Sequence, residues 1–198
     1  MSNQVYRNPY NGGNKYLPQI TKNIYKLPAD IEISQTTYGV NWTGLKWVEL
    51  NGSIVSVNPA APNKLLYIPA PATVDEIRPE SDTTVDAGVT YFYVMESADY
   101  HIEFTTVWKG LVPGSHFIGI QVQTYNPVTL VWDTDPIVHG AKSGLQVPSG
   151  NPLVIGLQLN IYLGSNQRFK AVCQTSNNNI IEGAHANLVD TNLIISRN

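Results

Sequence analysis

The chain has 198 residues, enough for one substantial hydrophobic core. Its formal net charge is −3 and only 14% of its residues are charged, against about 25% in a typical globular domain, so composition does not favour nucleic acid or a membrane surface as a partner. Cys173 is the single cysteine, which excludes an intrachain disulfide and a cysteine-rich metal site.

Residues 1–34 form an aromatic, basic segment with no core of its own. Prolines and Gly12-Gly13 interrupt it, and its apolar residues follow neither a helical nor a strand period. Disordered tails are poor in aromatic residues, so we expect an extended arm that docks on a partner or, as an alternative, folds back on its own or a neighbouring subunit. Tyrosines as anchors and cations facing an acidic surface are the expected docking residues: Tyr6, Arg7, Tyr10, Lys15, Tyr16, Lys22, Tyr25 and Lys26.

Residues 35–84 are expected to connect this arm to the body and to contain one β-hairpin. Residues 45–50 and 53–57 are strand-like, and Asn51-Gly52 between them supplies the two positive φ angles of a type I′ turn. Several prolines follow and bracket a short strand at 64–68, which disfavours a continuous helix.

The body is expected to occupy residues 85–198, where β-branched and aromatic runs are dense and no helical pattern occurs. Gly, Pro and Asn turns separate these runs, and this spacing predicts an antiparallel β-sandwich. The expected strands are 89–95, 100–108, 117–125, 129–132, Leu153–Leu163, Arg168–Thr175 and 188–196.

Leu153–Leu163 has the clearest pattern, with leucine or isoleucine at every second position. A solvated sheet face usually carries Lys, Glu or Asp, yet residues 143–167 contain no charge. We therefore expect this second face to be covered by another copy of the chain; the alternative is a polar, uncharged face in water. Its residues are Val154, Gly156, Gln158, Asn160 and Tyr162.

The order of these segments resembles the trimeric jelly roll of the C1q and tumour-necrosis-factor type. The resemblance covers residues 85–198 and rests on Tyr100-His-Ile-Glu-Phe104, Pro113-Gly-Ser-His-Phe-Ile-Gly-Ile-Gln-Val122, the long alternating strand ending at Gly164, and Thr191-Asn-Leu-Ile-Ile195. In that family the sheet holding the last two strands packs around a threefold axis. The resemblance implies a homotrimer with these residues at or near the axis: His101, Glu103, Gln158, Asn160 and Tyr162.

An arm followed by a trimeric jelly-roll knob also resembles a head fibre or capsid decoration protein of a tailed bacteriophage, in particular of the crAss-like phages. The resemblance implies a non-enzymatic virion structural protein whose arm binds the major capsid protein or another virion protein. It implies synthesis in the host cytoplasm and a final place on the capsid surface. Residues 1–4 lack the features of a secretory signal, and no stretch approaches the ~18 apolar residues of a membrane span.

A receptor- or carbohydrate-binding knob of a phage tail fibre or adhesin is the alternative function, with a cell-surface glycan as the partner in host attachment. The tryptophans are the residues that would stack on sugar rings, although a core position is the ordinary role of such a residue. They are Trp42, Trp47, Trp108 and Trp132.

Catalytic chemistry is not expected, and neither is a cofactor or a metal. The sequence contains no nucleophile elbow, phosphate loop, dinucleotide fingerprint or zincin motif. Asp133 and Asp135 are spaced as a carboxylate pair, but Asp and Pro also mark the end of a strand. Asp99, His101 and Glu103 alternate on one strand face, where an exposed or interface position is commoner than a metal site.

Overall fold

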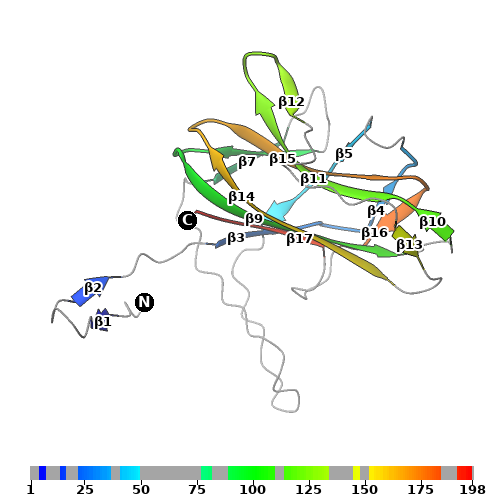
Figure 1. Cartoon of the computed structure of the whole chain (residues 1–198), viewed down its shortest axis with the longest axis horizontal. Coiled ribbons are helices and arrows are strands. Elements are labelled where there is room, and N and C mark those ends of the chain that lie inside the picture. The colour runs from blue at the N-terminus through cyan, green and yellow to red at the C-terminus, as the bar shows by residue number, and fades with distance from the viewer. Residues whose placement is uncertain are drawn as a thin grey trace, which may run out of the picture.

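In the segments that the computed structural model describes, the protein consists of β-strands and the turns between them (Figure 1). The described residues are 5–7, 14–16, 22–36, 41–49, 77–81, 89–109, 114–133, 145–147, 152–183 and 191–197. Within them there is no helix long and apolar enough to span a membrane.

One sheet is built around the long strand β9 (Ala98–Lys109) and is called here the β9 sheet. Along one edge β9 pairs with β14 (Leu153–Leu163), and along the other with β17 (Asn192–Arg197) and β16 (Asn179–Ile181) in succession. The sheet continues from β17 to β3 (Lys22–Lys26) and β6 (Val48–Glu49), and from β16 to β4 (Ile31–Ile33), with every pairing antiparallel.

The second sheet, called the β15 sheet, is arranged around β15 (Arg168–Thr175), which pairs with β11 (Ile118–Asn126), β8 (Thr90–Val94) and β5 (Thr43–Gly44). Its outer strands are β12 (Val131–Asp133) and β7 (Ile77–Ser81). Two short pairs complete the described strands: β1 (Val5–Arg7) with β2 (Asn14–Tyr16), and β10 (Gly114–His116) with β13 (Leu145–Val147).

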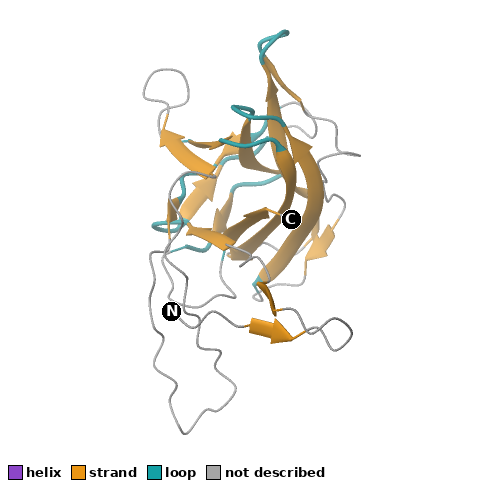
Figure 2. Ribbon diagram, turned by 90° about the vertical axis from the view of Figure 1, so that its left-hand side faces the viewer, coloured by secondary structure: helices purple, strands orange, loops and turns teal. Residues whose placement is uncertain are grey.

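The chain crosses repeatedly between the two sheets, which is the connectivity of a jelly roll. Strands β8, β11, β12 and β15 belong to the β15 sheet, and β9, β14 and β17 belong to the β9 sheet. Along the chain the strands therefore switch from the β15 sheet to the β9 sheet after β8, after β12 and after β15, and return after β9 and after β14. Figure 2 shows the sheets stacked as two layers. The expectation of an all-β antiparallel jelly-roll sandwich is therefore confirmed.

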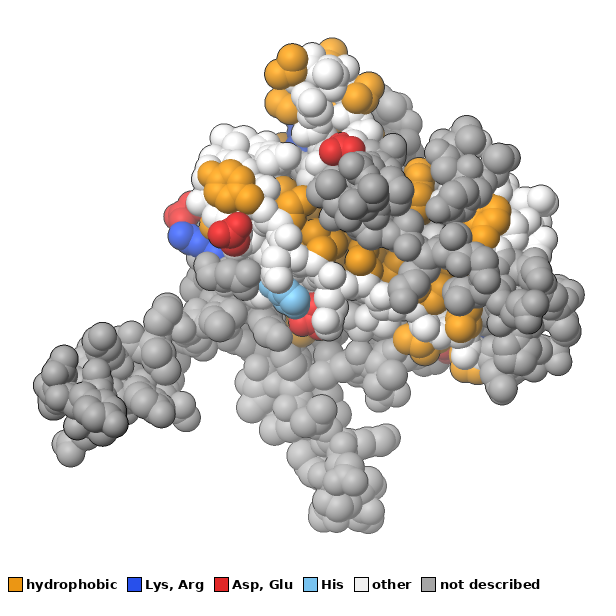
Figure 3. Space-filling model, in the orientation of Figure 1, with side chains coloured by type: hydrophobic (Ala, Val, Ile, Leu, Met, Phe, Trp, Pro, Cys, Tyr) orange, Lys and Arg blue, Asp and Glu red, His pale blue; other side chains and the backbone are white. Residues whose placement is uncertain are grey.

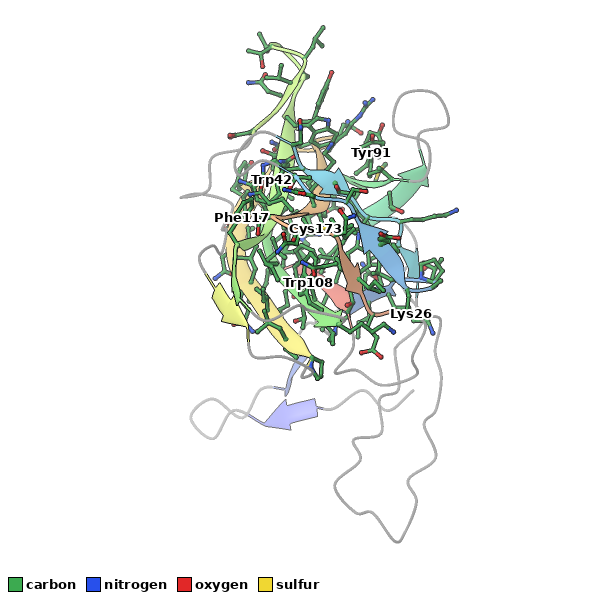
Figure 4. All side chains as sticks on the ribbon, turned by 90° about the vertical axis from the view of Figure 1, so that its right-hand side faces the viewer. Lys26, Trp42, Tyr91, Trp108, Phe117 and Cys173 are labelled. Atoms are coloured by element: carbon green, nitrogen blue, oxygen red, sulfur yellow. The ribbon has the colours of Figure 1, made fainter. Side chains whose placement is uncertain are left out.

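Aromatic side chains fill the space between the layers. Trp108 and Cys173, labelled in Figure 4, are fully buried there, one from each sheet. Phe92 joins the two layers, because its ring lies 4.8 Å from that of Tyr25 on the β9 sheet and 5.2 Å from that of Phe169 on its own sheet. Cys173 is fully buried, and this burial raises the pKa of its thiol, so this cysteine is a packing residue.

The body begins earlier in the chain than the sequence indicates. Strands β3 and β4 lie within the expected arm of residues 1–34, yet the structure pairs them with β17 and β16. Leu45 and Trp47, from the expected connecting region, are also core residues. The second strand of the expected hairpin at Asn51-Gly52, and the expected strand at 64–68, lie outside the described residues.

Candidate self-association face

Strand β14 lies at one end of the β9 sheet, and among the described strands β9 is its only hydrogen-bonded neighbour. The pairing runs over the whole strand, from Leu153 opposite Trp108 to Leu163 opposite Ala98. Since successive side chains of a strand point to opposite faces, β14 presents an inward row, an outward row and a long free backbone edge.

The inward row of β14 is less completely buried than the neighbouring row on β9. Leu157, Leu159 and Ile161 are half-buried, whereas Phe104, Ile102 and Tyr100 directly opposite them are fully buried. The period-two alternation predicted from the sequence is thus present, but in a single copy only Ile155 and Leu163 of this row are buried. In Figure 3 hydrophobic side chains run along β14 at the surface.

The five residues expected at a subunit interface lie together on the outward face of β9 and β14. Asn160 is opposite His101, and Gln158 is opposite Glu103. The His101 ring connects these pairs: Nδ1 lies 2.8 Å from Asn160 Oδ1, and Nε2 lies 3.2 Å from Glu103 Oε1. Tyr162 follows on the same face and is 64% exposed.

The same face continues across β17 and β3, where Ile194 is half-buried and Ile24 is only 5% exposed. Ile194 is opposite Glu103 on the far side of β9, and Ile24 is opposite Ile194. Val154 of β14 is 53% exposed on this face. On β14 this face carries amide, apolar and tyrosine side chains and no charge, whereas on β9 it carries Asp99, His101 and Glu103. Depletion of charge, as on β14, is typical of the central part of a protein interface. Among the described residues no cluster of three potential ligands is placed to hold a metal ion.

The expected docking residues are distributed over two parts of the structure. In the β1–β2 pair, Val5 is opposite Tyr16, Tyr6 is opposite Lys15 and Arg7 is opposite Asn14. Tyr10 lies outside the described residues. Lys22 and Lys26 are at the two ends of β3, where Lys26 is half-buried.

Tyr25 is part of the body's own core and is only 2% exposed, which leaves it no surface for docking. Burial raises the pKa of its hydroxyl, and the nearby Glu49 carboxylate adds to this effect. The positions of the tyrosines in residues 1–34 do not predict the burial of Tyr25, because Phe92, whose ring packs against it, lies far along the chain.

The four tryptophans separate into different roles. Trp108 and Trp47 are core residues, which excludes them as sugar-stacking residues. Trp42 is half-buried and lies over Gly119, where a Cβ would approach its ring within 3.1 Å. Trp132 alone among them lines a hollow at the surface; Asp133 lines it too, whereas Asp135 lies outside the described residues.

That hollow is a feature the sequence did not single out. It lies between the β11–β12 hairpin and the turn from β14 to β15, and three aromatic rings line it: Tyr93, Tyr125 and Trp132. The sequence does indicate that aromatic and basic side chains share a sheet face here. Tyr91 and Tyr93 are two positions apart in one strand, as are Arg168 and Lys170 in another, so each pair lies on one face of its strand.

Comparison with known proteins shows the fold. The chain is similar to the Eiger TNF of S. frugiperda, with a TM-score of 0.54 and 11% identity over 90% of this chain and 92% of that one. Two structures of murine APRIL, at pH 5.0 and pH 8.5, give TM-scores of 0.43 and 0.44 at 8% identity, covering 90% of this chain and 100% of those chains. No protein-family model and no curated protein matches. The chain therefore has a TNF-like jelly-roll fold.

Proposed function

We propose that this protein is a homotrimeric virion structural protein, a head fibre or capsid decoration protein of a tailed bacteriophage. Its body self-associates through the free edge of β14 and the outward face of β9 and β14. Its N-terminal residues dock on the particle, and the jelly roll projects outward without catalytic activity.

The incompletely buried apolar row of β14 is the observation that supports self-association. An exposed, long, apolar edge strand promotes uncontrolled pairing unless something covers it. Full burial of a large apolar side chain contributes about 1.5–3 kcal/mol. Leu157, Leu159 and Ile161 are half-buried in one copy, so assembly can still add part of this stabilisation. Tyr162 and Val154 are exposed in one copy, so assembly can add more of it at these two positions.

A closed assembly agrees with this surface better than an open one, because rotation around an axis covers the same edge in every copy. The number of subunits, three, comes from the resemblance to the tumour-necrosis-factor type. The role on a virion is supported by the layout, in which a basic, tyrosine-rich N-terminal segment precedes a body with few charges.

Light scattering coupled to size exclusion at micromolar concentration tests the assembly. We expect a particle of three times the 21.8 kDa chain mass. A mass equal to that of one chain across this concentration range contradicts the proposal.

A further inference from the structure

The hollow beside the β11–β12 hairpin has the dimensions of a ligand site. Its volume is about 1010 Å³, at the upper end of the range of about 300–1,000 Å³ found for small-molecule pockets. One wall is the hairpin with Tyr125, Asn126 and Trp132, and the other is the β14–β15 turn. Neither wall contributes to the self-association face, so a role for the hollow is independent of the proposed assembly.

Aromatic rings and one guanidinium form the floor of the hollow. The Arg168 guanidinium carbon lies 4.9 Å from the ring centre of Tyr93 and 5.4 Å from that of Tyr125. The Trp132 ring packs edge-to-face against Tyr125 at 5.2 Å. Arg168 is exposed, and among the described residues it makes no ion pair with a carboxylate.

The Trp132 side chain packs against two side chains of the β15 sheet, Tyr91 and Lys170. Its ring stacks on Tyr91, labelled in Figure 4, at 5.3 Å between centres and 12° between planes. The ammonium group of Lys170 lies 4.3 Å from the Trp132 ring centre. The ring is therefore fixed before any ligand arrives, although it stays partly exposed.

The hairpin wall is preformed. Asn126 Oδ1 accepts hydrogen bonds from the backbone N–H groups of Val128 and Thr129, at 2.9 and 3.2 Å. Leu130 has a φ of 58°, a conformation that leucine rarely adopts and that persists only when its surroundings impose it. A preformed wall reduces the entropy that a ligand must lose on binding.

The opposite wall is equally well defined and is polar. Asn166 also has a positive φ, of 64°. The Gly164 N–H donates to Gln167 Oε1 at 3.0 Å, and the Ser165 N–H donates to Ser97 Oγ at 2.8 Å. The turn thus presents hydroxyl and amide side chains at the rim of the hollow.

From this arrangement we propose that the hollow binds a saccharide. A sugar ring has an apolar face of C–H groups, which stacks on aromatic rings, and a rim of hydroxyls, which need amide, hydroxyl and guanidinium partners. The hollow supplies both kinds of surface. Single-stranded nucleic acid would also stack here, but phosphates require several cations, and the residues that line this hollow include one arginine and one carboxylate, Asp133.

The test is a panel of immobilised hexasaccharides, namely cello-, xylo-, chito- and galacturono-oligosaccharides, followed by titration of any that bind. We expect at least one to bind the full-length protein and to change its tryptophan fluorescence, because Trp132 lines the hollow. Trp132→Ala should weaken binding about tenfold or more. Since Trp132 also packs on Tyr91, Asn166→Gly is the second variant: it removes a rim amide and keeps a residue that accepts the positive φ.

Arg168→Gln is the charge variant, and Arg197→Gln is its matched control, because Arg197 pairs with Glu96 and neither residue lines the hollow. Binding weakened by Arg168→Gln and unchanged by Arg197→Gln supports the site. Absence of binding to every hexasaccharide, or binding unchanged in all the hollow variants, overturns it. Light scattering of the same samples reports the oligomeric state separately, so failure of this site and failure of the proposed trimer are distinguishable.

Discussion

Gly183 shows how one residue position joins two distant parts of the chain. A Cβ at this position would lie 2.2 Å from the carbonyl oxygen of Ala29 and 2.9 Å from the Cβ of Leu27. The Gly183 N–H donates to Asp30 Oδ1 at 2.9 Å. The N-terminal segment therefore packs against the end of β16 so closely that a side chain does not fit.

Gly183→Ala should lower the free energy of unfolding by about 1–3 kcal/mol, the usual cost of overpacking, since the two nearest opposing atoms belong to the Ala29 backbone and move little. Gly164→Ala is the control, because its Cβ would meet only Gln167 Oε1, at 3.9 Å, and we expect a change within about 0.5 kcal/mol. Denaturant unfolding of both variants at one protein concentration measures this. Equal stability of the two would contradict the packing described here.

At the scale of elements, β14 combines a regular sequence pattern with an exposed position. Every inward residue is apolar, as in a central strand, yet β14 has a neighbour on one side only among the described strands. Natural edge strands are usually short, bulged or charged. Strand β14 is 11 residues long and uncharged, as expected if another copy covers this edge in the proposed trimer.

Tyr162→Glu should convert the trimer to single chains without unfolding them, because this side chain is largely exposed in one copy and a buried, unpaired carboxylate would be costly in the assembly. Val128→Glu is the matched control: Val128 is 88% exposed at the tip of the β11–β12 hairpin, away from β14. Light scattering gives the masses and circular dichroism checks the fold. A trimer that persists in Tyr162→Glu would exclude this residue from the interface.

At the scale of the whole molecule, N-terminal strands complete the sandwich. Strand β3 pairs with the C-terminal strand β17, and Tyr25 and Leu27 enter the core beside residues of the central strands. Strand β4 extends the same sheet through β16, with Ile33 fully buried. The proposed docking segment is therefore placed before Lys22, outside the strands that complete the sandwich.

Two deletions separate docking from folding. Removal of residues 1–21 should leave a folded trimer that no longer decorates purified capsids, because the body keeps β3. Removal of residues 1–34 should destabilise the body as well, since Tyr25, Leu27 and Ile33 are lost from the core cluster and each such loss costs about 2–5 kcal/mol. Thermal unfolding and imaging of mixed particles measure the two effects. Attachment of the chain lacking residues 1–21 would contradict docking by the N-terminal segment, and equal stability of both deletions would contradict the placement of β3.

The sequence by itself determined the class of fold and the position of the main body strands. Alternation of apolar and polar residues is a local property, so it identifies a strand such as β14 and the two faces of that strand. The same alternation predicts that His101 and Glu103 share one face of their strand. In the structure, Asn160 and Gln158 of β14 lie opposite them.

Only the tertiary structure decided which strands lie at an edge, which aromatic residues enter the core and where a hollow opens. Tyr25 and Trp132 are both aromatic residues near turns, yet one is buried under Phe92 and the other lines the surface. The difference arises from pairings between distant segments, such as β3 with β17 and β15 with β8. No short-range pattern specifies a strand's neighbour, because backbone hydrogen bonds are the same for every sequence and the choice is made by packing of the complete core.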